Sequence, residues 1–311
     1  MIVSLARPKD ILLRLAVITR TTMPKPQIAP PKFEDVAESV LSRHARLWKP
    51  STLSVCRSYL RNQILPFFGA LPIGDITHVH VRRWFASLAA TPAAANRSLP
   101  VLSVILKGAE ALGHRADDSN PCIGIKRHRL QGRSRFLTSG EMQRLGAALD
   151  AHEAHAQAVV AVVRLLLLTG ARQGEIRRLQ WRDYREGNLY LPDGKTGPRT
   201  VWLSSAARSV LDSLPETGHW VFPKPCGTEP TSTSTLYRHW HILRKDADLP
   251  DVRLNDLRHS YASFALRRGE TVVTIGRLLG HRDPNTTLRY LHFADPLARQ
   301  STETVGAALA E

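Results

Sequence analysis

The segment Asn255-Asp256-Leu257-Arg258-His259 opens a helix that is expected over about residues 256–268. The apolar residues of this helix recur at helical spacing and predict a face that packs on a core: Leu257, Tyr261, Phe264 and Leu266. Arg258 therefore lies in the first turns of a helix that is anchored to the interior of a domain.

Around this segment the chain is expected to be mainly α, with one small antiparallel sheet. Leu189-Tyr190-Leu191 and Thr200-Val201-Trp202-Leu203 flank a turn that contains Asp193-Gly194, which is a strong signal for a β-hairpin. Upstream, Thr138 precedes a buried helix that is expected to run to Leu168, with Gly170 as its C-cap. The remaining C-terminal helices are expected at about 205–214, 234–247, 271–279 and 285–293.

Composition divides the chain into two domains. Residues 24–32 contain four prolines and are typical of a linker. The expected divisions are an N-terminal extension and Pro-rich linker (1–32), a helical domain (33–127), a basic linker (128–135), a second domain (136–300) and a C-terminal tail (301–311). In the helical domain Ser51 is an expected N-cap, and residues at helical spacing are expected to face the core: Leu53, Cys56, Leu60 and Ile64.

The charge balance indicates a polyanionic partner. Lys and Arg total 43 against 27 acidic residues, which gives a formal net charge of +16. Cations that neutralise nucleic-acid phosphates release condensed counterions, so an excess of this size favours DNA or RNA. The basic residues proposed for DNA contact are Arg57 and Arg61, one turn apart on a helix, and Arg133 and Arg135 in the linker.

The cysteines and the longest apolar run argue against a disulfide framework and a membrane span. The three cysteines are odd in number and far apart, which fits a reducing cytoplasm. The run from Ala158 to Leu168 is interrupted by Arg164 and is shorter than the ~20 residues that a membrane helix needs. This run is expected to be a buried core helix.

Residues suited to phosphate chemistry recur in the second domain. They are Arg172 after the expected C-cap at Gly170, Lys195 at the hairpin tip, Arg258, His281 after Leu278-Leu279-Gly280, and Tyr290. Glu175 is expected to pair with Arg172 or to cap the next helix. Each residue alone has an ordinary structural explanation, such as an ion pair, a surface lysine or a packed tyrosine. Five separate structural roles do not easily explain the order and spacing of the whole set.

Four motifs carry a resemblance to a known family: Thr-Gly-Ala-Arg-x-x-Glu, Asp-Leu-Arg-His-Ser-Tyr-Ala-Ser, Leu-Leu-Gly-His-Arg-Asp and Thr-x-x-Tyr-x-His. They resemble the signature boxes of the tyrosine recombinases, or phage integrases. The resemblance covers roughly residues 33–300 and is densest in the C-terminal half. It implies a helical core-binding domain followed by an α+β catalytic domain.

The resemblance also implies the roles of the site residues. Arg172 and Arg258 would bind the scissile phosphate, His281 would be a further phosphate ligand, Lys195 the general acid and Tyr290 the nucleophile. One position departs from the family, because the histidine usual three residues before the second arginine is Asn255 here. Asparagine can donate a hydrogen bond to phosphate but cannot carry a proton, and general acid–base assistance is typically worth about 100- to 10,000-fold.

The expected activity is site-specific cleavage and rejoining of double-stranded DNA through a 3′-phosphotyrosine, with the chain acting in integration, excision or resolution of a mobile element. No cofactor or metal is expected. The expected partners are a homotetramer on paired DNA sites, assembled from free monomers or weak oligomers, and an accessory DNA-bending or directionality protein. Three alternatives stay open: a DNA-binding protein with weakened catalysis, a topoisomerase-like nicking-closing enzyme, and a generic basic nucleic-acid-binding module.

Overall fold

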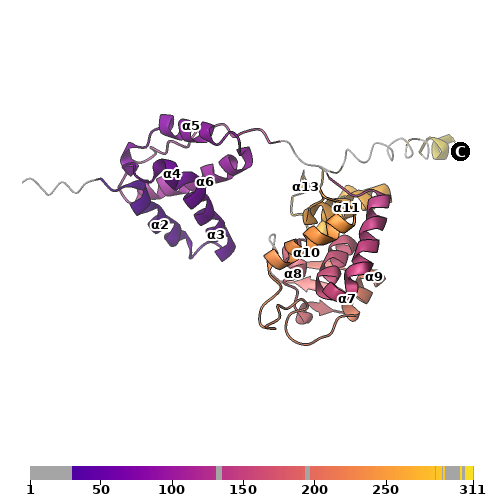
Figure 1. Ribbon diagram of the computed structural model, residues 1–311. Helices are drawn as coiled ribbons and strands as arrows, with labels where there is room; N and C mark the ends of the chain where they lie inside the picture. The colour runs from indigo at the N-terminus through magenta and orange to yellow at the C-terminus, as the bar shows by residue number, and fades with distance from the viewer. Residues whose placement is uncertain are drawn as a thin grey trace, which may run out of the picture. The chain divides into compact units, whose positions relative to one another are not determined.

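The computed structural model describes residues 30–130, 135–192, 197–283, 285–288, 290, 302 and 305–310. By its internal contacts the chain divides into two compact units, Met1–Gly132 and Arg133–Glu311 (Figure 1). Lys195 and Arg133 lie outside the described residues.

The first unit is a bundle of helices. Its elements are α2 (Phe33–His44), α3 (Pro50–Tyr59), the π-helix η1 (Leu60–Ile64), α4 (Leu65–Phe68), the short 3₁₀ helix η2 (Ile73–Asp75), α5 (His78–Ser87) and α6 (Pro92–Ala111). The core contains the side chains that were expected there from their helical spacing: Leu53, Cys56, Leu60 and Ile64. The expected N-cap at Ser51 is wrong, since α3 begins at Pro50 with Lys49 as its N-cap. Proline suits the first helical turn because its φ is fixed and its missing N–H would have no partner there.

The second unit combines helices with a three-stranded sheet. Its elements are α7 (Ser139–Thr169), α8 (Gln173–Arg177), η3 (Trp181–Asp183), β1 (Tyr184–Arg185), β2 (Asn188–Leu191), β3 (Arg199–Trp202), α9 (Ser205–Asp212), α10 (Thr233–Asp246), α11 (Leu254–Arg267), α12 (Val272–Leu279) and α13 (Asn285–Leu288). The fold is thus mainly α with a small antiparallel sheet, as the sequence predicted.

The long helix α7 is the centre of the second unit. Thr138 caps its N-terminus, where the Thr138 hydroxyl accepts from the backbone N–H of Glu141, and Gly170 ends it with a left-handed φ of 60°. Ala156 (φ −145°, ψ 36°) interrupts the helix with a kink. The helix is long and apolar enough to cross a membrane by length and composition, but Val159–Leu166 supply much of the hydrophobic core. It is therefore the buried core helix that the sequence predicted.

The sheet has the strand order β1-β2-β3, and both pairings are antiparallel. β2 and β3 form the expected hairpin, with Leu189 opposite Val201 and Tyr190 opposite Thr200. The two-residue strand β1 was not expected. The hairpin matters to the site because it brings Arg199, the first residue of β3, back toward α8.

Candidate active site

The site is built on the ends of two helices that stop at glycine. Gly170 ends α7 and Gly280 ends α12, with φ of 60° and 67°. A side chain strains the backbone in this left-handed region, whereas glycine enters it readily. The two turns also leave no space, because a Cβ on Gly170 would lie 2.6 Å from a Tyr261 ring carbon, and one on Gly280 2.5 Å from Cδ of Arg199.

The end of α12 presents a row of carbonyl groups to three arginines. The backbone N–H groups of Gly280 and His281 donate to the carbonyls of Arg277 and Gly276, which closes the helix as a Schellman motif. The next three carbonyls each accept from one guanidinium. Arg199 donates to Leu278 at 3.1 Å, Arg258 to Leu279 at 2.8 Å and Arg172 to Gly280 at 3.2 Å. The negative end of the helix dipole favours this cluster of cations.

Arg258 is the most deeply buried of the three arginines. It is 6% exposed and also donates to the carbonyl of Gly170 at 2.7 Å, so it joins the two glycine-ended helices. Burial, followed by the nearby Arg172 and Arg199, lowers the pKa of Arg258 to about 10. Arg258 therefore remains cationic at neutral pH while its position is fixed by two carbonyls.

Glu175 holds the other two arginines in place. Its carboxylate accepts from Arg172 at 3.0 Å and from Arg199 at 2.8 Å, and also from the backbone N–H of Arg172 at 2.9 Å. Burial acts to raise the pKa of Glu175, but hydrogen bonds and charge from Arg199 and Arg172 outweigh it, so that the pKa is lowered overall. Both expected roles of Glu175, pairing with Arg172 and capping α8, are confirmed.

Arg199 was missed by the sequence analysis. Its side chain is 9% exposed, and its partners Glu175 and Leu278 lie 24 and 79 residues away in the chain. The sequence signal was its position at the start of the second hairpin strand, but only the tertiary fold shows that this strand faces α8 and α12.

Tyr290 lies beside α11 and α12 with its hydroxyl bound to a histidine. The side chain is 3% exposed and belongs to an apolar cluster formed by Ala262, Leu266, Ile275 and Leu279. The hydroxyl lies 2.8 Å from Nδ1 of His259, and Nε2 of that ring lies 3.1 Å from Nδ2 of Asn255. The Tyr290 hydroxyl also acts to raise the pKa of Arg258, against the larger lowering by burial.

His281 follows the glycine turn directly and is oriented by a buried threonine. Its Nδ1 lies 2.7 Å from the Thr287 hydroxyl, and Thr287 is 1% exposed. The structure thus gathers Arg172, Arg258, His281 and Tyr290 around α11 and the end of α12. Within the part of the chain that the structure describes, Asn255 is linked to them through His259.

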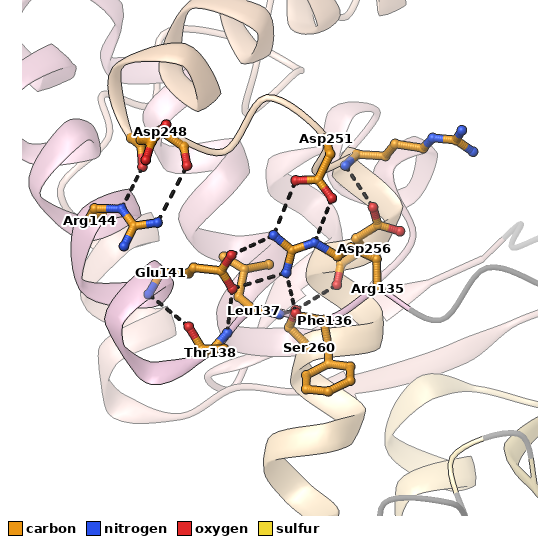
Figure 2. Close-up of polar contacts among 12 residues, drawn as sticks. Arg135, Phe136, Leu137, Thr138, Glu141, Arg144, Asp248, Asp251, Asp256 and Ser260 are labelled. Carbon is orange, nitrogen blue, oxygen red and sulfur yellow. Dashed lines mark hydrogen bonds and ion pairs between the residues drawn. The ribbon is translucent and has the colours of Figure 1, made fainter.

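Arg135, a proposed DNA contact, is enclosed by carboxylates at the start of the second unit (Figure 2). It donates to Glu141 at 2.6 and 3.0 Å, to Asp251 at 2.9 and 3.3 Å, and to the carbonyl of Phe136 at 2.6 Å. The adjacent backbone N–H of Leu137 donates to Ser260 of α11 at 2.8 Å. These bonds give Arg135 a structural role, and its contact with DNA stays a prediction.

Arg57 and Arg61 line one open pocket of about 370 Å³ in the first unit, together with residues of α3. Arg57 donates to Glu38 at 2.5 and 2.8 Å, whereas Arg61 is exposed. Arg61 is therefore the better placed of the two for an external phosphate.

Among the described residues, no group of three or more His, Cys, Asp or Glu side chains is placed to hold a metal ion. The chemistry available at the site is that of fixed guanidinium groups, imidazoles and a phenol. Guanidinium groups can hold a phosphate bidentately, and a phenol can attack it as a nucleophile. A mainly helical unit with this set of side chains has the groups that a phosphodiester-transferring enzyme of the tyrosine-nucleophile class needs.

Comparison with known proteins supports this class over both units. Residues 135–296 match the phage integrase family, and residues 32–89 match the N-terminal SAM-like domain of phage integrases. A prophage phiRv2 integrase of Mycobacterium tuberculosis is 31% identical over 283 residues, which cover 84% of this chain and 74% of the relative. The integrase of Escherichia phage P2 is 30% identical over 161 residues, covering 51% of this chain and 43% of that protein.

Solved structures share the fold. A lambda integrase dimer bound to a core site has a TM-score of 0.67 at 22% identity, and covers 81% of this chain and 94% of that one. A Tn1549 transposon integrase in complex with DNA has a TM-score of 0.66 at 14% identity, covering 83% and 94%. The chain belongs to the phage integrase family and is a tyrosine-type site-specific recombinase.

Proposed function

We propose that this recombinase cleaves double-stranded DNA by attack of Tyr290 on a backbone phosphate, and rejoins it to a partner strand. The observation that carries the proposal is the placement of the Tyr290 phenol in the same unit as three arginines held at the end of α12. Nucleophile and phosphate-binding groups come from one chain, so each protomer has the parts of a complete site.

Arg172 and Arg258 bind the non-bridging oxygens of the scissile phosphate and offset the charge that grows in the transition state. His281 donates a further hydrogen bond. The phenolic oxygen of Tyr290 forms a bond to phosphorus as the bond to the 5′-oxygen breaks, and Lys195 gives that oxygen its proton. The products are a 3′-phosphotyrosine and a free 5′-hydroxyl.

The reaction exchanges one phosphoester for another, so it conserves the bond energy and needs neither a nucleotide nor a metal. The 5′-hydroxyl of a second duplex reverses the attack and completes the exchange. The lambda integrase tetramer bound to a Holliday junction, a structure with a TM-score of 0.67 to this chain, supports four protomers acting on two duplexes.

The two units divide the work. Residues 33–127 form the core-binding domain that contacts DNA, 128–135 the basic linker and 136–300 the catalytic domain. The tail from Ala294 to Glu311 docks on a neighbouring protomer, and an accessory protein sets direction. The enzyme acts in the cytoplasm.

The test is a covalent adduct on DNA. A binding site is selected from randomised duplexes with the full-length protein and is then rebuilt with a nick beside the cleavage position. Cleavage releases the short fragment that carries the 5′-hydroxyl, so religation is prevented and the covalent adduct persists. We expect a protein–DNA band on denaturing gels that is missing with Tyr290→Phe and reduced at least about 100-fold with Arg172→Ala, the size of effect seen when one preorganised charge-stabilising donor is removed. An adduct that persists with Tyr290→Phe would assign the nucleophile elsewhere.

The strongest rival is a DNA-binding protein with weakened catalysis, which Asn255 favours because that residue cannot transfer a proton. Saturated binding of the selected site with no adduct supports the rival. A nicking-closing enzyme gives the adduct but relaxes plasmids that carry one site. A recombinase needs two sites, so products from a two-site plasmid separate these outcomes.

A further inference from the structure

The hydrogen bond of the Tyr290 hydroxyl bears on how the nucleophile loses its proton. The family signature assigns no residue of this chain to that step. Phenol is a weak nucleophile until it loses its proton, because at neutral pH only about one tyrosine in a thousand is ionised at the ordinary pKa of ~10. The position at which the family carries a histidine is Asn255, and an amide cannot accept the proton. Another group must do so.

We propose that His259 is the general base that takes the phenolic proton of Tyr290, and that Asn255 positions its imidazole. This inference rests on the function proposed above and adds a residue to its mechanism. Nδ1 of His259 lies 2.8 Å from the Tyr290 oxygen, within the range for direct proton transfer between hydrogen-bonded atoms. The second nitrogen of the same ring faces the Asn255 amide at 3.1 Å.

The proton balance of the step is complete. The hydrogen on the Tyr290 oxygen moves to Nδ1 of His259 as that oxygen bonds to phosphorus. The 5′-oxygen leaves with the electrons of its phosphorus bond and takes its proton from Lys195. In the reverse step, the attacking 5′-hydroxyl gives its proton to the now neutral Lys195, and His259 returns its proton to the tyrosine oxygen as the new phosphodiester forms.

Asn255 suits the positioning role because its amide can serve both states of the ring. A neutral imidazole that accepts from Tyr290 at Nδ1 carries its hydrogen on Nε2, and this hydrogen is donated to the amide oxygen. The amide oxygen and nitrogen exchange places by a half-turn of the side chain, so either atom can face Nε2. After proton transfer, the same oxygen stabilises the imidazolium.

The helix explains why His259 can reach the tyrosine. Asn255 and His259 are four residues apart on α11, so they lie on one face. Arg258 is the neighbouring residue but turns inward to the carbonyls of Gly170 and Leu279. One helix thus supplies an arginine to the phosphate side of the site and an imidazole to the nucleophile.

Arg258, the neighbour of His259 on α11, lies among charged groups from several elements. Tyr290, Arg172 after α7, Glu175 on α8 and Arg199 on β3 all act on its charge, and His281 follows α12. The lowered pKa of Glu175 and the pKa of about 10 for Arg258 keep both of these groups charged near neutral pH. Imidazoles are the groups that ordinarily titrate between pH 5 and 8. If the cleavage rate falls as the pH is lowered through this range, the responsible group is His259 or His281. Loss of this pH dependence in a His259 variant would assign it to His259.

The decisive variant is His259→Asn. An asparagine amide occupies nearly the place of the Nδ1 edge of histidine, so it keeps a hydrogen bond to Tyr290 but cannot take the proton. We expect single-turnover cleavage of the nicked substrate to fall about 100- to 10,000-fold, with DNA binding and thermal unfolding unchanged. The remaining rate should rise with pH, because only the spontaneously ionised phenol then reacts.

A substrate with sulfur in place of the bridging 5′-oxygen separates the two ends of the reaction. A thiolate leaves without a proton, so this substrate should restore cleavage by Lys195→Met but not by His259→Asn. His259→Ala, which opens a space at the ring position, should regain part of its rate with added imidazole. Asn255→Asp should move the acid fall of the rate to higher pH, since a carboxylate stabilises the imidazolium.

Three results would overturn the assignment: a His259→Asn rate within about threefold of the parent, an acid fall that survives in this variant, or full rescue of the variant by the sulfur substrate. Each leaves the proposed function intact as long as Tyr290→Phe forms no adduct. An adduct with Tyr290→Phe would instead remove the proposed function itself.

Discussion

At the scale of single residues, the candidate site depends on two glycines whose carbonyls hold the two proposed phosphate-binding arginines. Gly170 accepts from Arg258, and Gly280 accepts from Arg172. Each glycine precedes a proposed site residue in the chain, by two positions for Arg172 and by one for His281. The backbone of one signature motif therefore orients the side chain of another.

Gly280→Ala tests this coupling. The added methyl meets a positive φ of 67° and a 2.5 Å contact with Cδ of Arg199, so both the turn and Arg199 must shift. We expect a loss of about 1–3 kcal/mol in the free energy of unfolding and at least a tenfold loss of cleavage. Gly269→Ala is the matched control, because its φ is 89° but nothing lies within 4 Å of the added atom. Gly269→Ala should lower the free energy of unfolding by about 1 kcal/mol and leave cleavage unchanged. Equal cleavage rates for the two variants would show that the turn at Gly280 does not position the arginines for cleavage.

At the scale of elements, the sequence predicted most of the helices but not how their ends meet. α9 to α12 were visible because their apolar residues keep helical spacing, and α9, α10 and α12 also begin at Ser or Thr N-caps. β1 was missed because two residues carry no alternation. The burial of Arg199 was missed because its partners lie far away in the chain. The kink at Ala156 was also missed, since no Pro or Gly marks it in the sequence. Of α13, expected over 285–293, the structure describes helix at residues 285–288.

The candidate site shows the same division. The positions of Arg172, Arg258, His281 and Tyr290 could be found from motif order. Which side chain contacts Tyr290 could not, because the His259 contact spans 31 residues and requires α11 and the segment after α12 to pack together.

The Arg135 cluster in Figure 2 fixes the entry of the chain to α7 and α11. Hydrogen bonds from Arg135, against the opposing effect of burial, hold the pKa of Glu141 down at about 2, compared with an ordinary value of 4.5. Because the folded pKa is the lower one, the stabilisation is complete above about pH 4.5 and is lost as the pH falls toward 2.

Glu141→Gln should therefore weaken the second unit at neutral pH but not in acid. Glutamine keeps an acceptor for the helix cap and loses the charge opposite Arg135. We expect the free energy of unfolding to fall by about 1–2 kcal/mol at pH 7, since solvent screens this partly exposed pair. The difference between variant and parent should shrink below pH 4.5. Amide hydrogen exchange in α7 and α11 measures it. Glu153→Gln is the control on the same helix, because Glu153 pairs with Arg164 at a more exposed position. It should lower the free energy of unfolding by less than about 0.5 kcal/mol. An equal loss for both variants at pH 7 would show that the Arg135 cluster stabilises the second unit no more than an exposed ion pair does.

At the scale of the whole molecule, the net charge of +16 sets how the protein meets DNA. Many of its cations are already neutralised within the chain. Arg135 is enclosed by Glu141 and Asp251, and Arg57 is bonded to Glu38. The count of 43 basic residues therefore overstates the number of phosphate contacts, and the salt dependence of binding is the more informative quantity.

Each phosphate contacted contributes a slope of about −0.9 to the plot of log binding constant against log salt concentration. Arg61 is exposed and shares a pocket with Arg57, and both were proposed to contact DNA. Arg61→Gln should therefore weaken binding to all sequences alike and reduce the slope by about 0.9. Lys107 gives the matched control, since its ammonium lies 2.8 Å from Glu110 and 3.2 Å from Asp118, and Lys107→Gln should leave the slope unchanged. Fluorescence anisotropy on the selected duplex at several salt concentrations measures both slopes. A counterion is released only where a cation of the protein replaces it at a phosphate. An unchanged slope with Arg61→Gln would therefore mean that the pocket shared with Arg57 does not lie against DNA. The phosphate contacts of the first unit would then have to come from its other helices.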